Sequence, residues 1–67
     1  MKNTIRELRK ERKLSQDDLA KLCNVTRQTI NAIENNKYDP TLSLAFKLAH
    51  SLEAIVDELF EFDMGRD

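Results

Sequence analysis

The chain has 67 residues, 40% of them hydrophobic, and 11 Lys or Arg against 12 Asp or Glu give a net charge of −1. This length allows one domain at most, and the hydrophobic fraction is too high for a disordered chain. The single cysteine, Cys23, excludes an intramolecular disulfide, and the sequence has no Cys/His cluster that could hold a structural zinc ion.

The first expected helix spans about residues 4–12. Thr4 is placed as its N-cap, and Glu7, three positions later, completes the pattern of a capping box. Ile5 and Leu8 are expected to face inward, whereas Arg6 is expected to face solvent.

Two short helices joined by a tight turn are expected next, over about residues 15–35. Ser15 is placed as the N-cap of the first, and Thr26 as the N-cap of the second. Asn24, between them, suits a left-handed turn residue. The expected apolar positions are Leu19, Ala20 and Leu22 on the first helix, with Cys23 as a further candidate, then Val25, Ile30 and Ile33.

The fourth expected helix follows Pro40 and begins at its N-cap, Thr41. Its inward stripe is Ala45, Leu48, Ala49 and Leu52, widened by Leu42, Leu44 and Phe46. A short fifth helix is expected over about residues 56–60. Residues 60–64 alternate apolar with acidic side chains, a pattern that fits a strand or a frayed helix end about equally well.

The two halves of the chain carry opposite charge. Residues 1–37 hold nine basic and five acidic residues, a net charge of +4, and residues 38–67 hold two basic and seven acidic residues, a net charge of −5. A polyanion would be attracted to the first half and repelled by the second. The alternative is that these charges only solvate a small surface. No apolar run is long enough for a membrane helix and no signal-peptide pattern is present, so the expected location is cytoplasmic.

The stretch over residues 15–36 resembles the helix-turn-helix signature of the phage repressor and Cro family, the XRE class. The matching residues are Gln16, Leu19, Ala20, Asn24, Val25, Thr26, Ile30, Ile33 and Glu34. The resemblance covers about residues 4–60 and implies an all-α domain of five helices over the whole chain. The chain is also similar to the very small cytolysin-operon repressor type, in which a C-terminal strand pairs with the N-terminus. Family members commonly have Gly where Lys13 and Asn24 stand.

The resemblance implies that the helix over residues 26–35 enters the major groove of DNA. The residues expected to contact base edges are Arg27, Gln28, Thr29, Asn31 and Ala32, where Gln pairs with adenine and Arg with guanine. The residues expected to contact phosphates are Gln16, Thr26, Asn36, Lys37 and Tyr38. Three alternatives stay open: Arg27 holds a phosphate, Gln16 faces solvent, or Tyr38 covers the edge of the core.

Arg9 and Glu34 are assigned a structural role by the same resemblance, as a buried ion pair between the first and third helices. His50 has no Asp, Cys or Ser constellation around it, so neither catalysis nor metal binding is expected there. Cys23 is expected to be a small core residue rather than a reactive thiol. No cofactor and no metal ion are expected.

The C-terminal region, about residues 52–64, is expected to pair with a second copy of the chain. The candidate interface residues are Leu52, Ile55, Val56, Leu59, Phe60 and Phe62, and the alternative is that they complete the core of the monomer. The favoured function is a homodimeric, sequence-specific transcription repressor that binds a palindromic operator. The alternative is an antitoxin-like or protein-interaction module that uses the same fold as a scaffold. No nucleophile–base pair, metal-ligand set or phosphate-binding glycine loop supports an enzyme.

Overall fold

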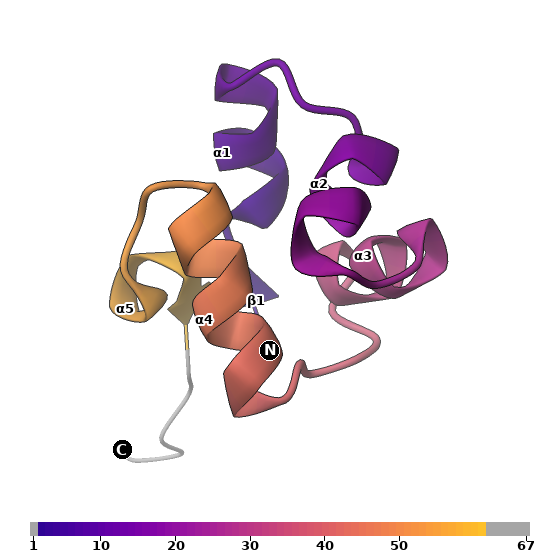
Figure 1. Ribbon diagram of the computed structural model, residues 1–67. Helices are drawn as coiled ribbons and strands as arrows, with labels where there is room; N and C mark the ends of the chain where they lie inside the picture. The colour runs from indigo at the N-terminus through magenta and orange to yellow at the C-terminus, as the bar shows by residue number, and fades with distance from the viewer. Residues whose placement is uncertain (1, 62–67) are drawn as a thin grey trace, which may run out of the picture.

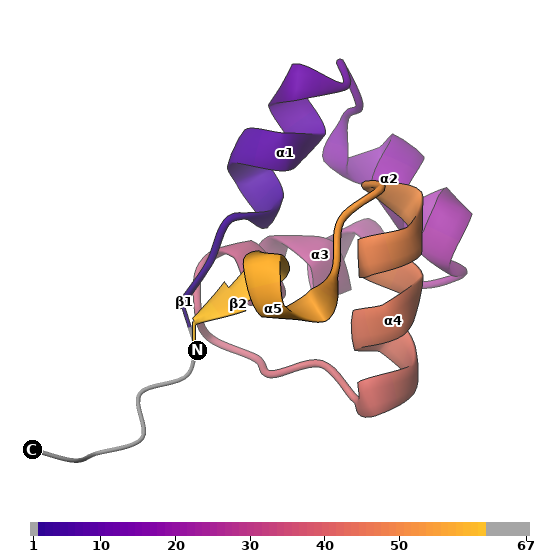
Figure 2. The ribbon, with the colours of Figure 1, turned by 90° about the vertical axis from the view of Figure 1, so that its left-hand side faces the viewer.

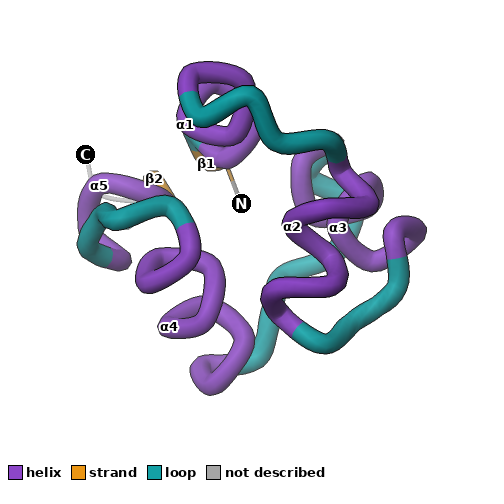
Figure 3. Tube along the Cα trace, turned by 45° about the horizontal axis from the view of Figure 1, so that its top comes forward, coloured by secondary structure: helices purple, strands orange, loops and turns teal. Residues whose placement is uncertain are grey.

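Five helices lie between two short strands in the computed structural model, which describes residues 2–61 (Figure 1). The elements are β1 (Lys2–Asn3), α1 (Ile5–Glu11), α2 (Gln16–Cys23), α3 (Arg27–Glu34), α4 (Leu42–Ser51), α5 (Val56–Leu59) and β2 (Phe60–Glu61). The helices surround a common centre, with α2 and α3 on one side and α4 and α5 on the other (Figure 3). The expected five-helix fold is confirmed, with helix ends within about one residue of the predicted ones.

Three of the four predicted N-caps hold their helices as expected. The Ser15 hydroxyl accepts a hydrogen bond from the Asp18 N–H, and the Asp18 carboxylate accepts one from the Ser15 N–H, both at 2.9 Å. The hydroxyls of Thr26 and Thr41 each accept one from the backbone N–H three residues later, at 3.2 Å. These bonds satisfy N–H groups that have no partner within the helix.

The capping box predicted at Thr4 is wrong. The Thr4 side chain makes no cap, and its hydroxyl instead donates to the carbonyl of Glu58 at 3.1 Å. The Thr4 N–H donates to the carbonyl of Leu59 at 2.9 Å. The Asn3 side chain accepts from the N–H of Ile5 at 3.1 Å. Pairing with the C-terminal segment therefore takes the hydroxyl that local sequence assigned to the helix.

Four helices end in the same way, on a residue with left-handed backbone. These residues are Lys13, Asn24, Asn36 and Glu53, with φ of 58°, 60°, 61° and 55°. In each case the next residue's N–H bonds to the carbonyl five positions earlier, at 2.9–3.0 Å, as in a Schellman motif. The left-handed turn predicted at Asn24 is confirmed, and these tight ends let short connections join successive helices.

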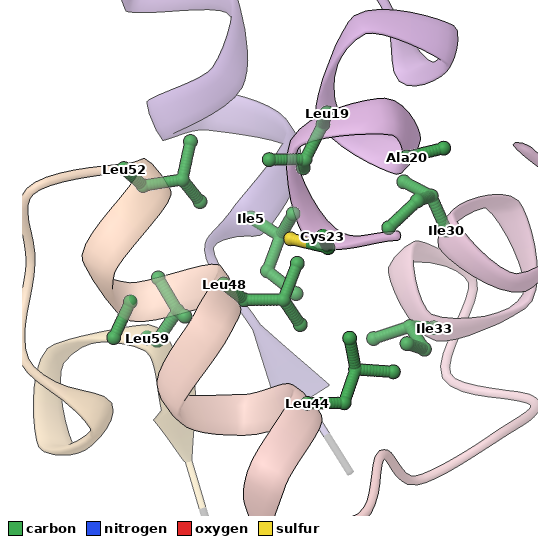
Figure 4. Close-up of a cluster of buried hydrophobic side chains, with 11 residues drawn as sticks. Ile5, Leu19, Ala20, Cys23, Ile30, Ile33, Leu44, Leu48, Leu52 and Leu59 are labelled. Atoms are coloured by element: carbon green, nitrogen blue, oxygen red, sulfur yellow. The ribbon is translucent and has the colours of Figure 1, made fainter. Parts of the chain in front are cut away.

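One apolar cluster draws on all five helices. Its fully buried side chains are Ile5, Leu19, Cys23, Ile30, Ile33, Leu48, Leu52 and Leu59 (Figure 4). Leu44, Ala45 and Ala49 complete the buried stripe of α4. This cluster sets how α2 and α3 pack, because each of these helices inserts two or more apolar side chains into it.

Three residues predicted to face inward are exposed instead. Leu22, Leu42 and Phe46 are 59%, 71% and 58% exposed. Leu42 and Phe46 are one turn apart on a flank of α4, whereas the core covers the stripe that contains Leu48 and Leu52. The sequence showed how broad the apolar face of α4 is, but not which part of it the neighbouring helices cover.

The strands β1 and β2, the first and last elements of the described residues, pair in a two-stranded antiparallel sheet (Figure 2). Lys2 pairs with Glu61 and Asn3 pairs with Phe60. The strand interpretation of residues 60–64 is therefore confirmed at residues 60–61, and residues 62–64 lie outside the described part. The sheet brings β1 and the start of α1 next to the end of α5.

Candidate nucleic-acid interface

The helix α3 buries one face and exposes the other. Ile30 and Ile33 lie in the core, while Arg27, Gln28 and Asn31 are exposed. Two further residues predicted to contact bases, Thr29 and Ala32, are half-buried between these faces. The structure thus brings polar side chains of the first turns of α3 together on one exposed surface.

The N-terminal turn of α3 combines these side chains with the positive end of the helix dipole. The hydroxyls of Thr26 and Thr29 lie 3.0 Å apart, and the Thr26 hydroxyl also accepts from the Thr29 N–H. Thr29 is therefore already engaged in the cap. Arg27 and Gln28 extend from the same turn, where a phosphate or a base edge would meet a positive potential.

The turn that follows α3 carries the other predicted phosphate contacts. Asn36 takes the left-handed conformation, and its side-chain oxygen accepts from the Asn3 amide at 3.2 Å. Lys37 and Tyr38 are exposed, and the exposed fraction of Tyr38 is 47%. The exposure of Tyr38 disfavours the alternative in which it covers the core edge. Asn3 also ties the turn to the N-terminus, because its amide donates to the carbonyl of Ile33 at 2.8 Å.

Behind the exposed face, Glu34 joins three elements. The Arg9 guanidinium donates to both carboxylate oxygens of Glu34, at 2.8 Å and 3.2 Å, and to the carbonyl of Leu14 at 2.9 Å. The side chains of Arg9 and Glu34 are 10% and 0% exposed. Gln16, the first residue of α2, donates to Glu34 at 3.0 Å. The ion pair implied by the resemblance is present, and it links α1, α2 and α3.

The ionisation of Glu34 reflects two opposing effects. Burial raises the pKa of this carboxyl, but hydrogen bonds from Arg9 and Gln16, the charge of Arg9 and a hydrogen bond from Arg6 together hold it below its usual value. A carboxylate that accepts several charge-assisted hydrogen bonds favours its ionised form. Glu34 is therefore an anion in the folded protein at neutral pH.

Two residues that belong to this cluster were not predicted from the sequence. Arg6 donates to Glu34 at 3.4 Å and to the side chain of Asn35 at 3.2 Å. The Asn35 amide in turn donates to the side-chain oxygen of Asn31 at 3.3 Å. A signal for Arg6 did exist, because it precedes Arg9 by three residues and so lies on the same helix face. Gln16 was predicted to contact a phosphate or to face solvent, and neither prediction included its hydrogen bond to Glu34.

The predicted dimer residues divide into two groups. Leu52 and Leu59 are 1% and 0% exposed, so they belong to the monomer core and their assignment to a dimer surface is wrong. Ile55 is 61% exposed, and Val56 and Phe60 are half-buried. The α4–α5 region folds back on the centre of the molecule, which takes two of the apolar residues inward. Phe62 lies outside the described residues.

Other chemically active side chains do not cluster. Burial raises the pKa of the Cys23 thiol, whose sulfur lies 3.7 Å from the Ser51 hydroxyl. Residues 2–61 contain no group of three or more His, Cys, Asp or Glu side chains arranged to hold a metal ion. No helix within this described range has the length and apolarity to cross a membrane.

The sequence and the fold match known proteins over most of the chain. The model of the helix-turn-helix family HTH_3 matches residues 5–55. An uncharacterized HTH-type transcriptional regulator of Methanocaldococcus jannaschii is 46% identical over 63 residues, which cover 94% of this chain and 96% of the relative. The immunity repressor protein of Bacillus phage phi105 is 41% identical over 58 residues, 81% of this chain and 40% of the relative.

Two solved structures with related sequences share the fold. The restriction-modification controller protein C.AhdI from Aeromonas hydrophila superposes with a TM-score of 0.78 and 36% identity, over 84% of this chain and 85% of that chain. A mutant of the restriction-modification controller protein C.Esp1396I gives a TM-score of 0.69 and 32% identity, over 75% of this chain and 65% of that chain. Both comparisons span most of this chain and show the same fold.

Proposed function

The chain belongs to the helix-turn-helix family of DNA-binding transcriptional regulators, and we propose that it is a homodimeric repressor that reads a palindromic operator with α3. The observation that carries this proposal is the exposed N-terminal face of α3. Arg27, Gln28 and Asn31 extend from that face, while Ile30 and Ile33 fix the helix to the core. A recognition helix needs this combination of exposed polar side chains on a rigid support.

Each residue proposed to contact DNA has a role that follows from its chemistry. Gln28 makes a bidentate pair with adenine, and Arg27 contacts a guanine or the adjacent phosphate. Asn31 reads a further base, and Ala32 packs against a thymine methyl group. The contacts that position the protein on the phosphates are made by Gln16, Thr26, Asn36, Lys37 and Tyr38.

Dimer formation follows from the number of bases that one recognition helix can read. A symmetric pair of subunits places two copies of α3 about one helical turn apart, in successive major grooves. The charge division of the chain supports an arrangement with the acidic half away from DNA. We place the contact between subunits on the exposed Ile55 together with Val56 and Phe60.

Repression by occupying promoter DNA is the simplest mode of action for such a dimer. The 41% sequence identity to a phage immunity repressor over 58 residues supports repression as the mode of action. The proposal places the protein in the cytoplasm with the genome and assigns it no enzymatic activity.

A salt-titrated binding experiment tests the proposal. Oligonucleotides selected from a random pool should bind with a Kd below about 10⁻⁷ M at physiological salt. Log K should fall linearly with log salt, by about 0.9 for each phosphate contacted. The Arg27→Ala/Gln28→Ala variant is the matched control, because both side chains are exposed and the fold should persist. Selection of no sequence over bulk DNA would favour the interaction-module alternative and overturn the proposal.

A further inference from the structure

Five side chains from α1, α2, α3 and the C-cap of α3 form a closed ring of hydrogen bonds: Arg6, Gln16, Asn31, Glu34 and Asn35. Arg6 donates to Asn35 at 3.2 Å and Asn35 donates to Asn31 at 3.3 Å. Asn31 donates to Gln16 at 3.5 Å and Gln16 donates to Glu34 at 3.0 Å. Arg6 closes the ring with its second bond, to Glu34 at 3.4 Å.

The two charged members of the ring, Arg6 and Glu34, determine which group of each amide donates and which accepts. A guanidinium can only donate hydrogen bonds, and an ionised carboxylate can only accept them. The Asn35 oxygen must therefore face Arg6, which leaves its NH₂ group for the Asn31 oxygen. The same reasoning turns the Asn31 NH₂ group toward Gln16 and the Gln16 NH₂ group toward Glu34. Three amides that could each be flipped are thus set in one orientation.

Asn35 is fixed more firmly than the side-chain distances alone indicate. Its NH₂ group also donates to the backbone carbonyl of Asn31 at 2.9 Å. Arg6 is held from the other side by Glu34, which is itself fixed by Arg9. The orientation of the exposed Asn31 amide therefore derives from a buried ion pair.

We propose that Asn35 is a positioning residue for DNA recognition, which sets the Asn31 amide in the orientation that selects its base. This inference rests on the proposed function, in which Asn31 faces a base edge. Adenine offers one acceptor and one donor side by side, so a flipped amide would present the wrong group to each. The Asn31 amide uses one N–H toward Gln16 and one lone pair toward Asn35, so it keeps one N–H and one lone pair for such a contact.

The test is a comparison of base preferences by selection from a random oligonucleotide pool. Asn31→Ala should flatten the preference at one base pair of each half-site. Asn35→Ala should reduce the preference at that same base pair by about three- to tenfold, a coupling typical of residues in one hydrogen-bond network. In the Asn31→Ala background, Asn35→Ala should change no preference further.

A second variant distinguishes positioning from a general loss of structure. In Asn35→Asp the carboxylate still accepts from Arg6 but cannot donate to Asn31, so the Asn31 oxygen would lose its donor and face a negative charge, and the preference at the base pair that Asn31 contacts should fall further than in Asn35→Ala. Asn36→Asp is the control, because it adds the same charge one residue later without a contact to Asn31. It should weaken binding to all sequences and leave the preferred base unchanged.

A measurement on the free protein checks the ring without DNA. The chemical shifts of the Asn31 side-chain amide should differ between Asn35→Ala and the unaltered chain, as seen by NMR, because the Asn31 oxygen loses the N–H that Asn35 donates to it. Equal shifts in the two proteins would overturn the inference, and so would a uniform loss of affinity over all sequences in Asn35→Ala. If Gln28→Ala alters base preference but Asn31→Ala does not, the inference fails while the proposed function stands. If the unaltered chain selects no sequence, both fail.

Discussion

At the scale of single residues, the side chains proposed to read bases differ in how much of their hydrogen-bonding capacity is already used. Thr29 shares its hydroxyl with Thr26, and Asn31 is held by Gln16 and Asn35. Gln28 is exposed and lies in the first turn of α3. Gln28 is therefore the residue at which sequence-specific contact is most directly tested.

Replacing Gln28 by alanine should cost about 1–3 kcal/mol of binding free energy, concentrated at one base pair of each half-site. The physical reason is the loss of a bidentate pair, which leaves the base edge without its partners. Competition binding against operators altered one base pair at a time would measure this effect. An equal loss of affinity for every sequence would show that Gln28 contacts the backbone of DNA instead.

Replacing Lys37 by alanine should weaken binding to all sequences alike and flatten the salt slope by about one unit per bound subunit. The ammonium group is exposed in the turn after α3, where we propose that it neutralises a phosphate. The control is Lys47→Ala, which removes the same charge from the exposed surface of α4. The two variants should differ in slope, and identical slopes would contradict a specific phosphate contact.

At the scale of the elements, the helix ends contain a feature that costs stability. Lys13 and Glu53 hold left-handed backbone where Gly or Asn would be easier, at a cost of about 1 kcal/mol each. The cost at Lys13 is tolerated because the bond from Leu14 to the carbonyl of Arg9 closes α1, and the Arg9 side chain in turn holds the carbonyl of Leu14.

Lys13→Gly should raise the free energy of unfolding by about 0.5–1 kcal/mol, because glycine has no Cβ to oppose a positive φ. Urea denaturation monitored by circular dichroism would measure the change. Lys10→Gly removes the same charge within α1 and should instead lower the free energy of unfolding by about 1 kcal/mol. If Lys13→Gly were as destabilising as Lys10→Gly, the strain at this position would be disproved.

The ion pair between Arg9 and Glu34 links α1 to α3. Removing one partner would leave the charge of the other buried and unpaired. Glu34→Gln should lower the free energy of unfolding by about 3–5 kcal/mol at pH 7, because Arg9 would remain buried without its counter-charge. Thermal melts of both proteins would measure the loss. An unchanged Tm would contradict a stabilising role for this pair.

The ion pair between Arg9 and Glu34 predicts that the free energy of unfolding depends on pH. The pKa of Glu34 is lower in the folded protein than its unfolded value of about 4.3. The stabilisation is therefore fully present above that unfolded value and is lost as the pH falls through the folded value. The difference in stability between the unaltered chain and Glu34→Gln should shrink as the pH is lowered below about 4. If this difference in stability stayed constant from pH 7 to pH 3, the lowered pKa of Glu34 in the folded protein would be contradicted.

At the scale of the whole molecule, we propose that a second subunit packs on the exposed Ile55. Ile55, the N-cap residue of α5, is 61% exposed. The helix α5 lies on the opposite side of the molecule from α2 (Figures 1 and 3). A dimer contact there would leave α2 and α3 free for DNA. This location also agrees with the negative charge of the C-terminal half.

Ile55→Asp should shift the protein from dimer to monomer in sedimentation analysis, because a buried, unpaired carboxylate would cost several kcal/mol in the interface. Leu22→Asp is the control, since Leu22 is similarly exposed, at 59%, but lies on α2. It should leave the sedimentation coefficient unchanged. A dimer that survives Ile55→Asp but not Leu22→Asp would move the interface to α2.

Local patterns in the sequence predicted the elements well because their causes are local. Ser15, Thr26 and Thr41 bond within their own first turns, so each cap could be predicted from a few neighbouring residues. Thr4 failed for a corresponding reason, because its hydroxyl bonds to Glu58, 54 positions away. Local sequence contains no information about such a partner.

The candidate site shows the same division between local and distant partners. The exposed positions Arg27 and Gln28 follow from helix periodicity, since Ile30 and Ile33 must face the core. The roles of Arg6 and Asn35 do not follow from helix periodicity, because these two residues meet only where α1 lies against the end of α3. Leu52 and Leu59 were assigned outward because the sequence does not say which apolar residues the monomer itself covers.

The sequence alone determined that this chain is a five-helix domain with polar side chains at the start of its third helix and opposite charges in its two halves. Periodicity, caps and charge counts are properties of short segments and need no knowledge of distant contacts. The tertiary structure alone decided the register in which β1 and β2 pair and that α4 leaves Leu42 and Phe46 in solvent. It also decided that five side chains close a ring of hydrogen bonds: Arg6, Asn35, Asn31, Gln16 and Glu34. Those features depend on which helices contact one another, and the packing of the common core determines these contacts.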